Sequence, residues 1–125
     1  MGNTPIKSFT DLEAWRQGHQ LVLLVYRFTK LFPREEAYIL IDQLRRAVVS
    51  VTSNVAEGFR RSTRADKRHF YVMSLASLSE IQNQLIIARD LGYISVATFQ
   101  TIAEQTVKVA RLLQGLIKSA TTRRV

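Results

Sequence analysis

The stretch QLRRAVVSVTSNVAEG, residues 43–58, decides between a helical and a mixed fold for this chain. Its β-branched run at residues 48–52, VVSVT, favours a strand by local propensity. No other segment of the chain offers a partner strand, so the wider pattern outweighs local propensity. That pattern alternates spacings of three and four residues, which is typical of one helix face. The stripe consists of Ile41, Leu44, Val48, Val51 and Val55.

Start and stop signals bound this helix and the one before it. Thr10 and Glu13 have the spacing of a capping box, and Pro33 disfavours helical geometry in the residue before it. Acidic residues near position 35 suit the positive end of the second helix. Gly58 is a residue type that often ends a helix. The first helix is therefore expected over residues 11–32 and the second over residues 35–57.

Two further helices follow in the second half of the chain. Thr63 provides a cap for a helix over residues 64–91, and Gly92 ends it. Ser95 caps a helix over residues 96–118, and residues 119–125 form a basic tail.

The four helices predict one all-α domain covering residues 1–125. Short connections favour an up-down-up-down antiparallel bundle, and an irregular all-α domain is the alternative. Gly and Pro number only 5 and 2, which argues against a turn-rich sandwich or barrel.

Composition limits the function classes. The chain has 125 residues and no cysteine, which excludes disulfides and Cys-ligated zinc. It shows no signal sequence and no apolar run of the roughly 20 residues that would span a bilayer, so we expect a cytoplasmic protein without membrane contact. Lys and Arg number 18 against 10 acids, a net charge of +8, and 13 of the bases are Arg. Phosphate-bearing partners are therefore plausible.

Apolar residues exceed what one bundle core needs. The core stripe of the first helix is assigned to Leu12, Trp15, His19, Val22 and Tyr26. A second apolar face on this helix and an extra face on the fourth helix predict an oligomer interface. The alternative is a wide core stripe with scattered surface aliphatic residues. The interface residues would be Leu21, Leu24, Val25, Phe28, Val107 and Ala110.

The positive charge is concentrated at one end of the predicted bundle. This end holds the N-terminus, the connection between the second and third helices, and the C-terminus. Nine bases against four acids give it a net charge of +5, whereas the opposite end is neutral. We assign phosphate contacts of RNA or DNA to the bases of the connection and the tail; a solvated charge run is the alternative. The candidate residues are Arg60, Arg61, Arg64, Lys67, Arg68, Arg123 and Arg124.

Catalytic and metal-binding signatures are not found. The chain has no nucleophile elbow, Walker loop or glycine-rich phosphate loop. A glutamate lies on each predicted helix, as in the bundles that hold two metal ions. Those sites also need Glu-x-x-His pairs, and this chain has none. We therefore expect neither enzyme activity nor a metal or other cofactor.

Several motifs together point to a family. They are FTDLEAW at residues 9–15, Phe32-Pro33, QLRRAVVS at 43–50, SNVAEG at 53–58, SLSE at 77–80 and LGYI at 91–94. The chain resembles the four-helix bundle proteins encoded in intervening sequences of bacterial large-subunit ribosomal RNA genes. One departure is Thr52, where the family usually has proline.

The resemblance implies a homopentameric ring. It also implies kinship with the accessory variability determinant of diversity-generating retroelements, a basic pentamer that binds nucleic acid and a reverse transcriptase. For the family's motif residues on the second helix we expect an ordered polar network at a helix or subunit interface; direct nucleic-acid contact by the two arginines is the alternative. These residues are Arg45, Arg46, Ser53, Asn54 and Glu57.

The sequence thus leads to the hypothesis of a non-enzymatic, oligomeric protein that binds nucleic acid, with RNA favoured by family association. The alternative is an adaptor that docks onto a protein partner such as a reverse transcriptase and has no nucleic-acid role of its own.

Overall fold

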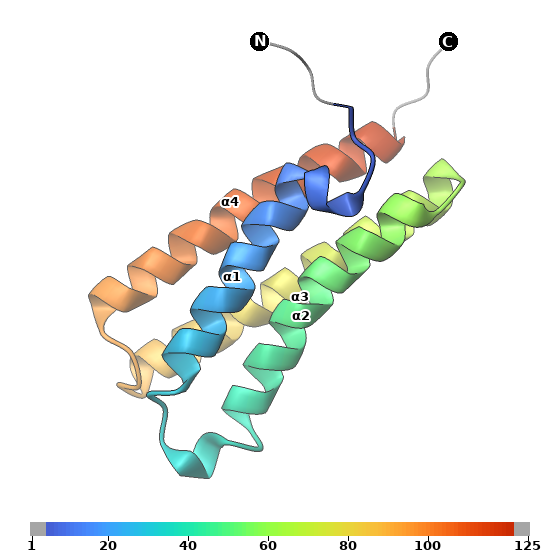
Figure 1. The fold of residues 1–125 in the computed structure, drawn as a ribbon. Coiled ribbons are helices and arrows are strands. Elements are labelled where there is room, and N and C mark those ends of the chain that lie inside the picture. Colours follow the sequence, from blue (N-terminus) through green and yellow to red (C-terminus); the bar gives the residue numbers. More distant parts are fainter. Residues whose placement is uncertain (1–4, 122–125) are drawn as a thin grey trace.

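The computed structural model describes residues 5–121 and folds them into an antiparallel bundle of four long helices (Figure 1). The helices are α1 (Glu13–Thr29), α2 (Leu40–Arg60), α3 (Arg64–Asp90) and α4 (Val96–Thr121), with 3₁₀ turns η1 (Phe9–Asp11) and η2 (Arg34–Glu36). Each helix packs against the next, and α1 also packs against α4. The described part of the chain contains no strand, so the all-α prediction is confirmed.

The chain enters α1 through a separate turn. Ser8 caps η1 and accepts a hydrogen bond from the Thr10 N–H at 3.3 Å, while Asp11 accepts from the Ser8 N–H at 3.1 Å. The predicted capping box of Thr10 and Glu13 is therefore wrong, because Leu12 has an extended backbone that divides η1 from α1. The capping box exists, but it lies two residues earlier.

The connection from α1 to α2 is longer than predicted. α1 ends at Thr29, and α2 begins only at Leu40. Pro33 has an extended ψ of 144° and precedes η2, which takes up the acidic residues that were expected to start the second helix. The Tyr93 hydroxyl donates to Glu36 at 2.7 Å and thereby ties η2 to the connection between α3 and α4.

The later helix limits follow the sequence signals more closely. Thr63 accepts from the Asp66 N–H at 3.1 Å, and Ser95 accepts from the Thr98 N–H at 3.1 Å. Gly92 has a φ of +78°, the left-handed geometry expected beyond the end of α3. The start of the predicted basic tail is helical, because α4 continues to Thr121, and the rest of it lies outside the described residues.

Gly58 does not end α2, which continues to Arg60. A Cβ atom at Gly58 would lie 2.7 Å from the Cε1 atom of Tyr71, closer than such contacts occur. The missing side chain therefore lets α3 pack tightly against α2, and the glycine serves packing rather than termination.

The core face of α1 differs from the predicted one. Leu21 and Val25, assigned above to an oligomer interface, are 0 % and 2 % exposed and lie in the core of the single chain. They have no surface to give to a second copy, so this part of the interface prediction is wrong. The core face comprises Ala14, Gly18, Leu21, Val25 and Thr29.

Small residues explain why α1 turns this face, rather than the predicted one, toward the core. A Cβ atom at Gly18 would lie 3.1 Å from the Thr52 methyl group, so α2 packs closely against this face. The predicted stripe lies beside it: Trp15 and Val22 are half-buried at the edge of the core, and Tyr26 is exposed. Counting only large apolar residues missed the face on which the helices come closest.

Candidate functional site

The basic end of the bundle brings three parts of the chain together. η1, the connection from α2 to α3 and the end of α4 lie at the same end of the bundle (Figure 1). The Arg68 Nε atom donates to the Thr121 hydroxyl at 3.0 Å, which links α3 directly to α4. Of the nine bases and four acids predicted at this end, seven bases and all four acids lie among the described residues. Arg16, which lies 3.9 Å from both Asp11 and Glu13, is an eighth base here, so the described part of this end has a net charge of +4. Arg123 and Arg124, predicted to contribute, lie outside the described residues.

Two of the candidate bases have structural partners at the α2–α3 corner. The Lys67 ammonium group donates to the carbonyl oxygens of Gly58 at 3.3 Å and Phe59 at 2.7 Å, and so satisfies the end of α2. Arg61 pairs with Glu57 at 2.8 Å, and its guanidinium group lies 4.6 Å from the centre of the Phe70 ring. These contacts hold the positive charges in place at the surface of the corner.

The other bases of the corner are more open. Arg60, Arg64 and Arg68 are all exposed, whereas Lys67 is half-buried. The structure therefore brings the five predicted bases of the corner together, with the four arginines exposed and Lys67 half-buried.

A hollow of about 770 Å³ lies between the start of α3 and the end of α4, and we name it the end hollow. Its floor includes Tyr71, which is 4 % exposed. Neither Tyr71 nor Gly115 is among the residues predicted from the sequence; for Gly115, a glycine inside an otherwise apolar helix was the available signal. Residues that shape the end hollow are Arg64, Lys67, Tyr71, Gly115, Lys118 and Ser119.

The predicted polar residues of α2 do not join into one network. Arg45 donates to the Thr29 hydroxyl at 2.9 Å and lies over the Tyr26 ring at 4.6 Å, so it links α2 to α1. Asn54 donates to the Ser50 side chain at 3.0 Å, which in turn contacts Ser77 of α3 at 2.8 Å.

The remaining members act within α2 or at its surface. Arg46 pairs with Asp42 at 2.8 Å, Glu57 pairs with Arg61 as described above, and Ser53 is exposed. The predicted set therefore comprises separate local contacts, two of which link helices.

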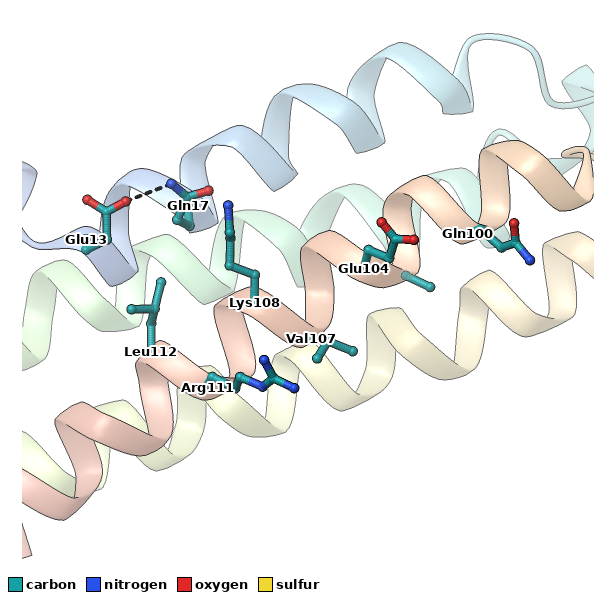
Figure 2. Close-up of a pocket in the computed structure, with 9 residues that line it drawn as sticks. Glu13, Gln17, Gln100, Glu104, Val107, Lys108, Arg111 and Leu112 are labelled. Atoms are coloured by element: carbon teal, nitrogen blue, oxygen red, sulfur yellow. Dashed lines mark hydrogen bonds between the residues drawn. The ribbon is translucent and has the colours of Figure 1, made fainter.

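A second hollow of about 820 Å³ lies along α4 beside α1, and we name it the side hollow. Figure 2 shows Lys108 and Leu112 of α4 reaching toward Glu13 and Gln17 of α1. Val107, a predicted interface residue, is 44 % exposed here.

The other predicted interface residues contribute less surface. Ala110 and Leu24 are half-buried, and Phe28 packs against the core. Val107 of α4 is thus the exposed member of the predicted interface set, whereas other exposed large apolar side chains lie on α1 and on α3. They are Leu23, Tyr26, Val72, Met73, Ile86 and Ile87.

Other chemistry at the surface is limited. The His19 ring stacks on Trp15 with centroids 4.9 Å apart, which is a packing contact. Within residues 5–121, no three side chains of the metal-ligating types lie close enough together to hold an ion. In the same range no helix is both long and apolar enough to span a membrane.

A match to a known protein family covers most of the four-helix bundle. Residues 10–115 match the 23S rRNA-intervening sequence protein family, a range that includes α1, α2 and α3 in full and most of α4. The chain belongs to this family. No curated protein matches the sequence. 

A solved structure shows the same fold as this family member. It is a crystal structure of a protein with unknown function from the S23 ribosomal protein family of Bacteroides thetaiotaomicron VPI-5482. The two chains share 19% sequence identity with a TM-score of 0.76, over 84% of this chain and 95% of the other. At this identity the likeness supports the bundle fold alone.

Proposed function

We propose that this family member is a non-enzymatic, cytoplasmic protein that assembles into a homo-oligomer and binds nucleic acid, preferably RNA, through phosphate contacts. The preference for RNA rests on the association of the family with ribosomal RNA genes. The observation that carries the proposal is the polarised charge of the bundle, with exposed arginines gathered at the α2–α3 corner.

The arginine contacts suit phosphate recognition. A guanidinium group offers a planar set of donors that matches phosphate oxygens, and it keeps its charge at any physiological pH. Phe70 beneath Arg61 and the Glu57 carboxylate hold one such group in a defined position. Because the contacts would be to the backbone, binding should depend on salt and only weakly on sequence.

The test removes charge from the corner and, separately, from the opposite end. Replacing Arg60, Arg61 and Arg68 by Ala should reduce the slope of log affinity against log salt for single-stranded RNA by about two. The matched control replaces Arg27, Lys30 and Arg34, three exposed bases toward the other end of the bundle, by Ala. Fluorescence anisotropy over a salt series measures the RNA affinity and its salt slope for both triple variants. Equal losses of RNA affinity in the two variants, or no loss in the corner variant, would contradict the proposed site.

The oligomer is proposed to be a pentameric ring with α4 at the contact between subunits. The exposed Val107 beside the side hollow supports a contact there, and charged residues of both signs flank it. Five copies of the polarised end would multiply the positive potential that one chain presents.

The second candidate function is an adaptor that docks a protein such as a reverse transcriptase, in keeping with a proposed kinship to the accessory variability determinant. The side hollow favours it, because Ala103, Val107 and Leu112 provide apolar surface with charged groups around it. Filter binding of RNA at physiological salt supports the first function, whereas retention of a reverse transcriptase without RNA binding supports the second.

A further inference from the structure

We propose that the end of the bundle opposite the basic end is a self-contact surface, through which two copies of this chain meet end to end. This surface comprises the α1–α2 and α3–α4 connections with their flanking residues, 30–39 and 89–96, and we name it the loop end (Figure 1). The inference goes beyond the proposed function, because the subunit contact proposed there lies along the side of α4.

The loop end carries the most exposed large apolar side chains of the described chain. Within residues 5–121, six such side chains are more than half exposed, and five of them lie here, whereas the sixth, Ile6, lies near the basic end. The exposed fractions of the five run from 56 % to 94 %, against 38–45 % for the exposed apolar side chains on the sides of the helices. An exposed apolar surface of this kind marks an interaction site. The five residues are Leu31, Tyr38, Ile39, Leu91 and Val96.

The two connections hold each other in place. The Tyr93 hydroxyl donates to Glu36 at 2.7 Å, and the Tyr93 and Phe32 rings lie 5.4 Å apart between their centres. Phe32, Leu40 and Ile94 are buried and belong to the core at this end. The exposed apolar side chains are therefore presented from a fixed platform, and a partner orders little of the chain on binding.

The charges of the loop end favour a second copy as the occupant. Residues 30–39 and 89–96 contain three bases and three acids, a net charge of zero in a chain of +8. Two copies therefore meet here without the repulsion that their basic ends would cause, whereas nucleic acid or an anionic lipid surface would favour a basic site.

Charges of both signs also suit a surface that meets itself. Arg34 and Glu35 are neighbours in sequence and both are exposed, and neither forms an ion pair with another described residue. In a twofold contact each copy presents the same surface to the other, so the basic group of one copy can pair with the acidic group of the second.

The apolar area is sufficient for a specific contact. At roughly 100 Å² for each aliphatic side chain and up to about 250 Å² for a tyrosine, the five side chains expose on the order of 500 Å² per copy. Two copies then bury about 1,000 Å² of apolar surface, which is the size that a specific interface needs, and polar atoms around it add to this area.

The experiment measures the mass of the whole chain by light scattering coupled to size exclusion, over a dilution series at physiological salt. Tyr38→Glu and Ile39→Glu should each raise the concentration at which the copies separate by about a hundredfold or more. The reason is that each variant removes one apolar side chain from both copies and sets like charges against each other. The mass should then fall by half, whatever number of chains the contact on α4 assembles.

Ile6→Glu is the matched control for Ile39→Glu. The two isoleucines are 56 % and 58 % exposed, and the control adds the same charge near the opposite end of the bundle. Its mass should equal that of the wild type. The helical circular dichroism of all three variants should be unchanged, because none of the three side chains belongs to the core.

The outcomes separate this inference from the proposed function. A mass that stays unchanged in both loop-end variants overturns the inference, while RNA binding and the contact on α4 are tested by their own variants. A mass that also halves in Ile6→Glu assigns the effect to the added charge and overturns the inference as well. Phosphatidylcholine vesicles that bind the wild type but neither loop-end variant, with no change in mass, would assign the loop end to a lipid surface instead.

Discussion

Gly58 and Gly115 both lie within helices, yet they serve opposite needs. At Gly58 a side chain would collide with the Tyr71 ring, whereas at Gly115 a Cβ atom would meet nothing within 4 Å. One glycine permits close packing of two helices, and the other leaves a surface hollow open. A single residue type thus has two physical roles that only its surroundings distinguish.

The two glycines predict opposite effects of the same substitution. Gly58→Ala should lower the free energy of unfolding by about 1–2 kcal/mol, because overpacking against Tyr71 exceeds the gain in helix propensity. Gly115→Ala should raise it by up to about 1 kcal/mol, because only the propensity gain applies. Urea denaturation of both variants measures the difference, and a stabilised Gly58→Ala protein would contradict the packing role.

Among the elements, η1 shows how a short turn fixes the start of a long helix. The Asp11 carboxylate accepts hydrogen bonds from the backbone N–H groups of Lys7 at 2.9 Å and Ser8 at 3.1 Å. These two bonds lower the pKa of Asp11 below its usual value, and the charges of Arg16 and Lys7 act in the same direction. The ionised carboxylate therefore stabilises the turn that leads into α1.

This geometry predicts a pH dependence of stability. Because the pKa of Asp11 is lower in the folded state, its contribution is complete above the unfolded value of 3.8 and is lost as the pH falls through the folded value. The wild type should be more stable than Asp11→Asn at neutral pH, and the gap should narrow below about pH 4. Thermal unfolding of both proteins over a pH series provides the measurement; a gap that stays constant into strong acid would contradict this role of the carboxylate.

Helix existence could be predicted from sequence more reliably than helix ends. Thr63, Ser95 and Gly92 act locally, through hydrogen bonds or backbone geometry within a few residues, and their roles are as predicted. Gly58 was assigned wrongly because its neighbour Tyr71 lies on another helix. Likewise the η2 turn that delays the start of α2 is bonded to Tyr93, far away in the sequence.

At the scale of the whole molecule, the helix faces that are buried in the core determine which surface remains available to a partner. Leu21 and Val25 are used inside the chain, and α4 retains the exposed Val107 beside the side hollow. A subunit contact on α4 would cover this apolar surface without disturbing the core. The interface is therefore testable by adding charge to one exposed position.

In a chain that also carries Tyr38→Glu, Val107→Arg should dissociate the proposed oligomer into single chains of 14.3 kDa while leaving the helical circular dichroism unchanged. Val49→Arg is the matched control, because Val49 is 41 % exposed on α2 and Val107 is 44 % exposed on α4. Light scattering coupled to size exclusion gives the mass of each variant. An oligomer that persists in Val107→Arg but not in Val49→Arg would place the subunit contact on α2 instead.

The sequence by itself determined the helical class, the order of the four helices and the concentration of charge at one end, because apolar periodicity, caps and charge order are properties of the chain read along its length. The tertiary structure alone decided that Leu21 and Val25 belong to the core, since the small residues Ala14 and Gly18 turn that face of α1 inward. It also decided that Tyr71 and Gly115 share a hollow with three cations. These residues lie on two helices far apart in sequence, and their proximity arises only when the helices pack.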